Sequence, residues 1–257
     1  MKHLFGYLLS PVYLLWFILL LLIFHPAQVV CRYLGGYSLR KKSVDLLNFL
    51  LLYGLVILGV RIRFRGFGQL PEGRPFIIVS NHQSLMDIPP IVWGFRKYHP
   101  KFVSKKELGK GIPSISYNLR HGGSVLIDRA NGRQSILEIS RLGKHIEQEN
   151  YCASIFPEGT RSKSGKMRRF QHPGIAALLR AAPHALLVPF VIDGNSRLTS
   201  MGYYPLQFGV RLNYTVLEPI DPAGRDIKEL TEEVEQKIKE SLGQAYPAGS
   251  TEHGRYA

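Results

Sequence analysis

Hydrophobic and polar positions divide the chain into an apolar N-terminal part and an alternating remainder. Two uncharged apolar runs, Leu4–Phe24 and Leu46–Val60, open the chain. Beyond residue 60, short apolar runs alternate with segments such as Gly132–Glu149, in which apolar residues recur every three or four positions. Short apolar runs are typical of strands, and the longer period is typical of amphipathic helices. The alternation predicts an α/β domain with helices covering a mostly parallel or mixed sheet.

The same pattern places the individual elements. Strands are predicted over Arg61–Phe67, Phe76–Ser80, Lys101–Ser104, Ser124–Ile127, Cys152–Phe156, Leu186–Ile192 and Val210–Leu217. Helices are predicted over Asp87–Gly94, Gly132–Glu149, Gly174–Ala181 and Ile227–Leu242. We find no repeat and no linker within residues 61–242 and expect a single domain there. We also expect a two-helix hydrophobic membrane anchor over residues 1–60 and a disordered tail, rich in Gly, Pro, Ser and Thr, over residues 243–257.

The first apolar run has 21 residues without a charge, enough to cross a bilayer core of roughly 30 Å as a helix. It is long for a signal peptide, and no convincing small-residue cleavage site follows it. The second run has 15 residues and reaches only about 22 Å. Basic residues between the runs would lie on the far side if both runs crossed the bilayer, against the positive-inside tendency.

Two topologies keep the basic residues on the cytosolic side. In one, the first run spans once and the second lies in the interface. In the other, the two runs form a hairpin that dips into one leaflet. Pro11 and the His25-Pro26 pair predict an irregular first helix and favour the hairpin.

Positive charge is concentrated in the middle of the chain. The net charge is +14, from 33 basic and 19 acidic residues. Residues 61–217 alone hold 23 basic and 9 acidic residues, a net +14, whereas residues 218–257 are net negative. Such a field suits nucleic acid, an anionic membrane or a phosphorylated substrate. The apolar N-terminus favours the membrane, and we find neither a helix-turn-helix nor basic residues interleaved with aromatics that would indicate nucleic acid.

His82 and Asp87 directly follow the predicted strand Phe76–Ser80. A histidine beside a carboxylate is the minimum arrangement for removing a proton from a hydroxyl near neutral pH. A five-residue step does not share a helical face, so the pair requires His82 in a turn and Asp87 in the first helical turn. Ser84-x-x-Asp87 also matches a capping box, in which the carboxylate bonds helix-end amides. The spacing leaves both interpretations open.

A second polar motif, Phe156–Ser162, ends another predicted strand and begins a cationic stretch. Its basic residues are Arg161, Lys163, Lys166, Arg168 and Arg169. Guanidinium groups and turn amides bind phosphate well, although a solvated basic loop is the simpler alternative. The stretch is not a nucleotide phosphate loop, because its glycine spacing is one residue too long and Met167 replaces the required Ser or Thr. Arg129 and Lys105 add cations after two further strands, where open α/β sheets collect ligands.

Five motifs occur in a characteristic order. They are His82-x₄-Asp87, Lys105-x-x-Leu108 with Pro113, Gly123-x-x-Leu-Ile-Asp-Arg129, Phe156-Pro-Glu-Gly-Thr-Arg-Ser162 and Val188-Pro-Phe-Val-Ile192. Over roughly residues 1–217 the chain thereby resembles the glycerolipid acyltransferases, and most closely the 1-acylglycerol-3-phosphate (lysophosphatidate) acyltransferases. It departs from the family pattern at Leu126, where Phe is more usual, and at Ser104, where Ala is common.

The resemblance implies an acyltransferase catalytic domain over residues 61–242. In it, His82 would be the general base and Asp87 its orienting partner. The glycerol-phosphate moiety would be held by Glu158, Gly159, Thr160 and Arg161, aided by Arg129 and Lys105. The implied reaction transfers an acyl group from an acyl thioester to the sn-2 hydroxyl of lysophosphatidate, forming phosphatidic acid. The alternative is the same chemistry on glycerol-3-phosphate, a lyso-phospholipid or a lyso-aminolipid.

The resemblance also carries expectations about partners and location. No metal or other cofactor is expected, and acyl-CoA or acyl-ACP would be the co-substrate, with acyl carrier protein as a partner in the second case. Anionic membrane lipid is an expected partner and nucleic acid is not. We expect the protein at the cell membrane, with its catalytic domain on the cytoplasmic face.

Overall fold

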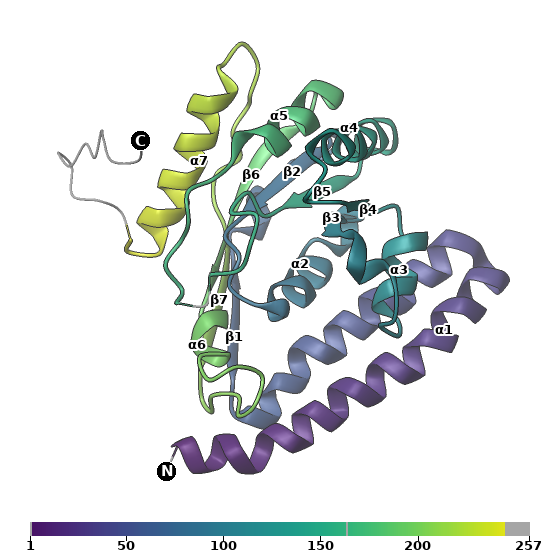
Figure 1. Ribbon diagram of the computed structural model, residues 1–257, viewed down its shortest axis with the longest axis vertical. Helices are drawn as coiled ribbons and strands as arrows, with labels where there is room; N and C mark the ends of the chain where they lie inside the picture. Colours follow the sequence, from purple (N-terminus) through teal and green to yellow (C-terminus); the bar gives the residue numbers. More distant parts are fainter. Residues whose placement is uncertain (1, 163, 245–257) are drawn as a thin grey trace.

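A computed structural model describes residues 2–162 and 164–244, and its centre is a seven-stranded sheet (Figure 1). The strands are β1 (Arg61–Arg65), β2 (Phe76–Ser80), β3 (Lys101–Lys105), β4 (Val125–Ile127), β5 (Cys152–Ile155), β6 (Leu186–Asp193) and β7 (Arg211–Val216). Their order across the sheet is β1-β7-β6-β2-β5-β3-β4. The neighbours β6 and β7 are antiparallel, and the other pairs in this order are parallel. The predicted mixed sheet is confirmed, and each strand end lies within two residues of its expected position.

Helices cover both faces of the sheet (Figure 1). They are α1 (Lys2–Tyr53), α2 (Ile88–Gly94), α3 (Ile115–His121), α4 (Gly132–Glu149), α5 (His172–Ala181), α6 (Asn195–Leu198) and α7 (Ile227–Ser241). On one face, α4, α5 and α7 share a hydrophobic cluster with Ile77, Val79 and Leu187. On the other, α2 and α1 pack with Phe76 and Phe190. The pattern did not predict α3, although α2 has the same length of 7 residues and was expected, nor α6, which at 4 residues is too short for a period to show.

The N-terminal segment is a helical hairpin (Figure 1). Helix α1 stays helical through Pro11 and Pro26 and leaves helical geometry only at Gly35 and Gly36. The irregularity expected at Pro11 and at His25-Pro26 was therefore wrong. Gly36 has φ = +59°, a conformation that costs glycine little because it lacks a Cβ. The chain turns there, and the basic residues 40–42 belong to the second leg instead of a loop.

The two legs of the hairpin pack antiparallel. The Tyr13 hydroxyl donates to the Leu51 carbonyl oxygen at 3.0 Å, and the Trp16 indole nitrogen donates to the Leu50 carbonyl oxygen at 3.1 Å. Hairpin and domain also share one hydrophobic cluster that contains both Tyr13 and Phe190. Because the packing is continuous, the division at residue 60 stays a prediction. The predicted tail lies, from residue 245 onward, outside the described residues.

Apolar side chains cover the outer side of the hairpin. Those that are 44% to 61% exposed in the first leg include Leu4, Phe5, Tyr7, Leu8, Val12, Leu15, Ile18, Leu19, Leu22 and Ile23. By length and composition, the helix His3–Leu58 could cross a membrane. A continuous apolar surface of this kind marks an interaction with another apolar phase, and it favours membrane association of this segment.

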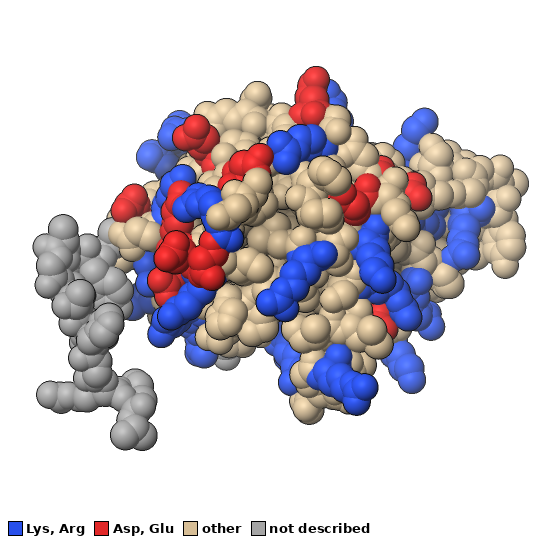
Figure 2. All heavy atoms as spheres, turned by 90° about the horizontal axis from the view of Figure 1, so that it is seen from above, with Lys and Arg blue, Asp and Glu red and all other residues tan. Residues whose placement is uncertain are grey.

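The polar surface is divided as the charge distribution predicts. Helix α7 carries glutamates along its length, as the acidic composition of the C-terminal region predicts. Figure 2 shows many of the acidic side chains gathered toward one side of the face, while Lys and Arg lie both among them and over the rest of it.

One edge of the sheet collects the segments of interest. Because β2, β5, β3 and β4 are parallel neighbours, their carboxyl ends meet at the same edge, and β6 also ends there. This edge faces the hairpin: the Tyr13 hydroxyl lies 3.7 Å from the sulfur of Met86, the residue before Asp87. Open α/β sheets bind ligands at such an edge.

Candidate active site

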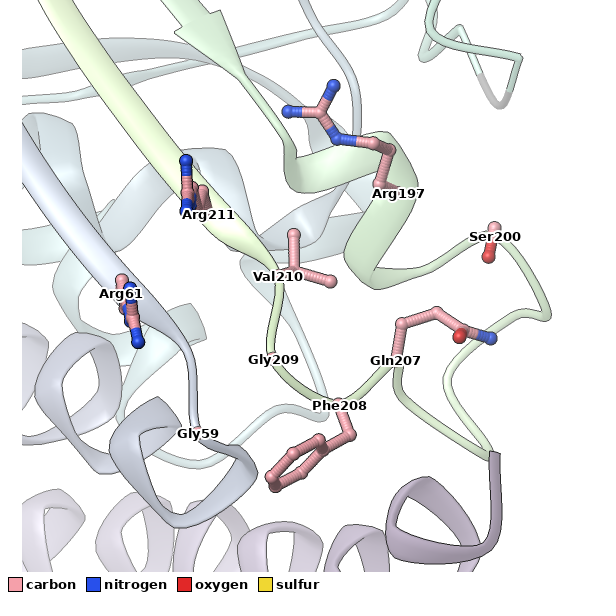
Figure 3. Close-up of a pocket in the computed structure, with 9 residues that line it drawn as sticks. All are labelled: Gly59, Arg61, Arg197, Ser200, Gln207, Phe208, Gly209, Val210 and Arg211. Carbon is pink, nitrogen blue, oxygen red and sulfur yellow. The ribbon is translucent and has the colours of Figure 1, made fainter. Parts of the chain in front are cut away.

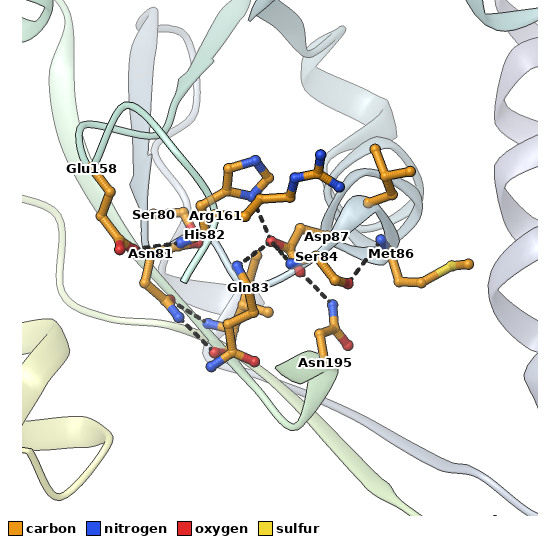
Figure 4. Close-up of polar contacts among 12 residues, drawn as sticks. Ser80, Asn81, His82, Gln83, Ser84, Met86, Asp87, Glu158, Arg161 and Asn195 are labelled. Atoms are coloured by element: carbon orange, nitrogen blue, oxygen red, sulfur yellow. Dashed lines mark hydrogen bonds and ion pairs between the residues drawn. The ribbon is translucent and has the colours of Figure 1, made fainter. Parts of the chain in front are cut away.

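His82 and Asp87 form a hydrogen-bonded pair at the carboxyl end of β2. Asp87 ends the short 3₁₀ turn Leu85–Asp87, which leads into α2. Its side chain is fully buried, whereas that of His82 is 14% exposed. The His82 Nδ1 and Asp87 Oδ2 atoms are 2.7 Å apart (Figure 4). The histidine is thus reachable from outside, and its carboxylate partner is not.

Donors surround the Asp87 carboxylate. Its Oδ2 accepts from the backbone amides of Gln83 at 2.6 Å and Ser84 at 3.0 Å, and its Oδ1 accepts from Asn195 Nδ2 at 2.7 Å. An ionised carboxylate only accepts hydrogen bonds, so His82 Nδ1 must be the donor in the pair. The lone pair of the imidazole is then at Nε2, where it can act as a base.

The capping interpretation also holds. The Ser84 hydroxyl accepts from the Met86 amide at 3.0 Å, and Asp87 bonds the Ser84 amide in return, which completes a capping box. One carboxylate therefore closes the helix start and orients the imidazole. The capping box and the His82–Asp87 pair, which the sequence left as alternatives, share the same Asp87 carboxylate.

The support behind Asp87 comes from residues that sequence reasoning missed. Asn195, at the start of α6, is fully buried, and its Oδ1 accepts from the Tyr214 hydroxyl at 3.0 Å. Asn81 bonds both backbone groups of Ile192 in β6, at 2.8 and 2.9 Å. The position of Asn195 could have indicated it as a site residue. It comes two residues after the end of β6, at the edge of the sheet where ligands bind.

Glu158 ties the two motif loops together. Its carboxylate accepts from the His82 amide at 2.7 Å (Figure 4). It also accepts from the Arg168 amide at 3.0 Å. The side chain is 7% exposed. Burial raises the pKa of Glu158 to about 7, although the two amide hydrogen bonds lower it. These contacts make Glu158 a positioning residue for the His82 backbone. Its expected contact with the substrate stays a prediction.

Further contacts hold the imidazole in place. The Phe156 ring stacks on it, with centroids 4.1 Å apart and an interplanar angle of 17°. The Ser162 amide donates to the His82 carbonyl oxygen at 2.8 Å. The loop after β5 thus contacts both the backbone and the ring of His82.

The cations predicted from sequence lie at the same sheet edge, on the loops after β3, β4 and β5. Arg161 is exposed, and it donates to the Tyr203 hydroxyl at 2.8 Å. Desolvation lowers the pKa of Arg129, Glu107 raises it, and the nearby charge of Arg161 lowers it further. Lys105 is exposed at the end of β3. The charges of Arg129 and Arg161 interact, and together they create a positive field at this edge of the sheet.

The remaining residues of the second motif form its turn. Gly159 and Thr160 are exposed, and Gly159 has φ = +70°. The structure therefore brings together the residues that the sequence predicted, and their roles as phosphate ligands stay predictions. Over residues 2–162 and 164–244, no group of three or more His, Cys, Asp or Glu side chains could hold a metal ion.

Residues 61–193 match the family model described as Acyltransferase. The chain belongs to the acyltransferase family. The match includes His82, Asp87, the second motif and the whole of β6.

Named relatives share this part of the chain. The 1-acyl-sn-glycerol-3-phosphate acyltransferase alpha of Mus musculus is 24% identical over 190 residues, which are 73% of this chain and 65% of the relative. The 1-acyl-sn-glycerol-3-phosphate acyltransferase of Saccharomyces cerevisiae is 26% identical over 221 residues, 84% of this chain and 70% of the relative. The chain spans about half to two-thirds of the length of the mammalian relatives it matches.

A solved structure shares the fold. The crystal structure of the 1-acyl-sn-glycerophosphate (LPA) acyltransferase, PlsC, from Thermotoga maritima matches with a TM-score of 0.75 and 24% identity. The match covers 96% of this chain and 100% of that chain, so the hairpin and the α/β domain occur together in both proteins. At this identity the likeness establishes the fold alone.

Proposed function

We propose that this protein transfers an acyl group from an acyl thioester to the sn-2 hydroxyl of 1-acylglycerol-3-phosphate, forming phosphatidic acid. The observation that carries the proposal is the His82–Asp87 pair, 2.7 Å apart, at a sheet edge that also carries Arg161 and Arg129. The names of the relatives support the same acceptor.

The reaction needs one base that later acts as an acid. His82 Nε2 removes the proton from the acceptor hydroxyl while its oxygen attacks the thioester carbonyl. The resulting tetrahedral oxyanion collapses, the carbon–sulfur bond breaks, and the thiolate takes the proton from His82. Asp87 stabilises the imidazolium between the two transfers. The products are the diacyl ester and a free thiol, and no acyl-enzyme is required.

The choice of acceptor rests on the basic residues Arg161 and Arg129. Guanidinium forks suit a phosphate monoester, which favours lysophosphatidate over acceptors without a terminal phosphate. Glycerol-3-phosphate also has such a phosphate but lacks an acyl chain. The exposed apolar surface of the hairpin is next to the sheet edge that carries His82 and Asp87, which we call the active edge. This position favours lysophosphatidate, the acceptor that already resides in a membrane.

The hairpin also suggests where the protein works. With its apolar side in the outer part of one leaflet, the hairpin would place the active edge at the level of the lipid head groups. We propose that the α/β domain faces the cytoplasm, where the acyl thioesters acyl-CoA and acyl-ACP are found, and that anionic lipid attracts its positive surface. Acyl carrier protein is a partner if acyl-ACP is the donor.

An acceptor panel tests the proposal. The full chain in neutral detergent micelles is assayed with acyl-CoA and, in turn, lysophosphatidate, glycerol-3-phosphate, a lyso-phospholipid and a lyso-aminolipid. We expect the highest kcat/KM for lysophosphatidate. Arg161→Ala should raise the KM for lysophosphatidate about 10- to 100-fold, because it removes a charge-assisted hydrogen bond worth roughly 1.5–3 kcal/mol.

The matched control is Arg180→Ala, which removes an exposed arginine at the end of α5. Its KM for lysophosphatidate should stay near the wild-type value, and neither variant should change the KM for the donor. Preference for another acceptor would reassign the substrate. A larger effect of Arg161→Ala on the donor KM would mean that the acceptor phosphate binds elsewhere.

A further inference from the structure

A basic hollow lies at the active edge, on the far side of α6 from His82. Its volume is about 950 Å³, and it is lined at the start of β1 and β7 by Arg61 and Arg211, together with Arg197 of α6 (Figure 3). Helix α6 separates the two places: Asn195 bonds Asp87, while Arg197, two residues later, lines the hollow. The mechanism above uses none of these three arginines.

Arg61 and Arg211 are neighbours without a counter-charge. They are paired in register on the parallel strands β1 and β7, and both are exposed. Figure 3 shows them side by side on the two strands. In the described part of the chain, neither guanidinium has a hydrogen-bond or ion-pair partner, whereas Arg197 pairs with Asp193 at 3.1 Å. Like charges opposite each other in a sheet are destabilising, and an anion between them would remove the repulsion.

The floor of the hollow rests on the hairpin. Phe208 packs against Phe5 of the first leg, with ring centroids 5.1 Å apart and an interplanar angle of 32°. The Leu206 amide donates to the Ser10 hydroxyl at 2.8 Å. A Cβ on Gly6 would lie 2.8 Å from the Leu206 carbonyl oxygen, so the loop and the helix approach as closely as glycine permits.

The loop that contributes Ser200, Gln207 and Phe208 to the lining of the hollow also has the character of a membrane interface. Met201, Tyr203 and Tyr204, in the loop between α6 and β7, are 40% to 53% exposed. Tyrosine is enriched where a protein passes from hydrocarbon to water, because its ring is apolar and its hydroxyl is polar. The hollow therefore adjoins the hairpin, through the contact of Phe208 with the half-exposed Phe5.

We propose that the hollow binds the phosphate of an anionic membrane lipid, at a site separate from that of the acyl acceptor. Two unpaired guanidinium groups on adjacent strands match the oxygens of one phosphate. The lipid would fix the tilt of the active edge against the bilayer. The inference rests on the membrane contact in the proposed function, but acyl transfer in micelles and lipid binding are measured separately, so either can fail alone.

Native mass spectrometry of the full chain, released from neutral detergent micelles, tests the site. Short-chain phosphatidylglycerol is the anionic probe; the sn-2 position of its diacylglycerol part is already acylated, and no acyl thioester is added. Short-chain phosphatidylcholine is the zwitterionic probe, and inorganic phosphate is added as a competitor. Arg61→Gln is compared with Arg65→Gln, an exposed arginine on the same face of β1 that pairs with Thr215 instead of an arginine.

We expect one phosphatidylglycerol to bind in preference to phosphatidylcholine, at least tenfold more weakly in Arg61→Gln and unchanged in Arg65→Gln. Arg211→Gln should repeat the loss, and thermal unfolding should show that each variant is folded. Equal losses in Arg61→Gln and Arg65→Gln, or equal binding of both lipids, would overturn the proposal. Displacement of the lipid by an equal concentration of inorganic phosphate would assign the hollow to a free anion and overturn it as well.

Discussion

Two buried charges, Asp87 at the active edge and Lys101 beneath the turn of the hairpin, are accommodated in different ways. Asp87 receives four hydrogen bonds, two of them from backbone amides within four residues. Lys101, at the start of β3, is 4% exposed, and its ammonium group donates to the Tyr37 hydroxyl at 2.6 Å. It also lies 4.8 Å from the ring centroids of both Tyr37 and Tyr151.

The two sites differ in how well the surrounding groups replace the water that each charge has lost. Burial is the largest influence on Lys101 and lowers its pKa to about 8, so the hydroxyl and the ring faces do not replace the lost water fully. The carboxylate, in contrast, accepts three hydrogen bonds at Oδ2 and one at Oδ1. The charge that orients the His82 imidazole thus has four hydrogen-bond donors, whereas the charge that joins the hairpin to the domain is only partly compensated.

The largest expected effect is on kcat, which a substitution at the His82–Asp87 site should lower and one at Lys101 should not. His82→Ala should lower kcat for acyl transfer by about 10²- to 10⁴-fold, the usual contribution of a general base, while the protein stays folded and associated with membranes. Lys101→Met should keep kcat near the wild-type value. Steady-state assays with lysophosphatidate measure both. Near-normal activity of His82→Ala would refute the assignment of the base.

A smaller effect on kcat is expected from a substitution of Asn195, which supports Asp87. Asn195→Ala leaves a carboxylate oxygen and the Tyr214 hydroxyl unpaired, so it should destabilise the protein by roughly 1–3 kcal/mol. It should also lower kcat between about 10- and 100-fold through misplacement of the His82–Asp87 pair. Denaturant unfolding and steady-state kinetics report the two effects.

The matched control for Asn195→Ala is Tyr214→Phe, which removes only the hydroxyl that donates to Asn195. It should cost about 1 kcal/mol and leave kcat closer to the wild-type value. An unchanged kcat in Asn195→Ala would show that the backbone amides alone orient Asp87.

The smallest effect is a pH dependence of stability at Lys101. Its pKa is about 8 in the folded state, against an ordinary value of 10.5, so between these values the folded chain binds fewer protons than the unfolded chain. The contribution of Lys101 to stability therefore rises with pH across this window, and its full cost is present below pH 8.

Lys101→Met lacks this titration and serves as the comparison. Thermal unfolding in neutral detergent micelles should show that wild-type stability, measured relative to the variant, increases from pH 7 to pH 10. A constant difference between the two proteins over this range would mean that Lys101 is no less protonated in the folded state than in the unfolded state.

Much of the sheet was predictable from the chain because each strand carries its own apolar run, as Phe76–Ser80 and Leu186–Asp193 do. The hairpin was predictable as an apolar segment, but its turn was not. Proline was expected to interrupt the helix at Pro26, yet the chain turns at Gly35 and Gly36, because a positive φ is needed for reversal and glycine adopts it at little cost.

The hydrogen-bonded pair of His82 and Asp87 was predictable for a local reason, and the residues that support it were not. His82, Ser84 and Asp87 interact across at most five residues, so their spacing alone limits the geometry. Asn195 reaches Asp87 across 108 positions, and Glu158 reaches His82 across 76. No local period records contacts at such separations.

The sequence by itself determined the type of fold, the apolar N-terminal segment and the pairing of His82 with Asp87, because these depend on the side chains within one strand or turn. The tertiary structure alone decided that Asn195 and Tyr214 support Asp87, that Glu158 holds the His82 backbone, and that Arg61 and Arg211 are opposite each other. Each of these contacts exists only after parallel strands have aligned their carboxyl ends, or β6 and β7 have paired, and so brought together residues from distant parts of the chain.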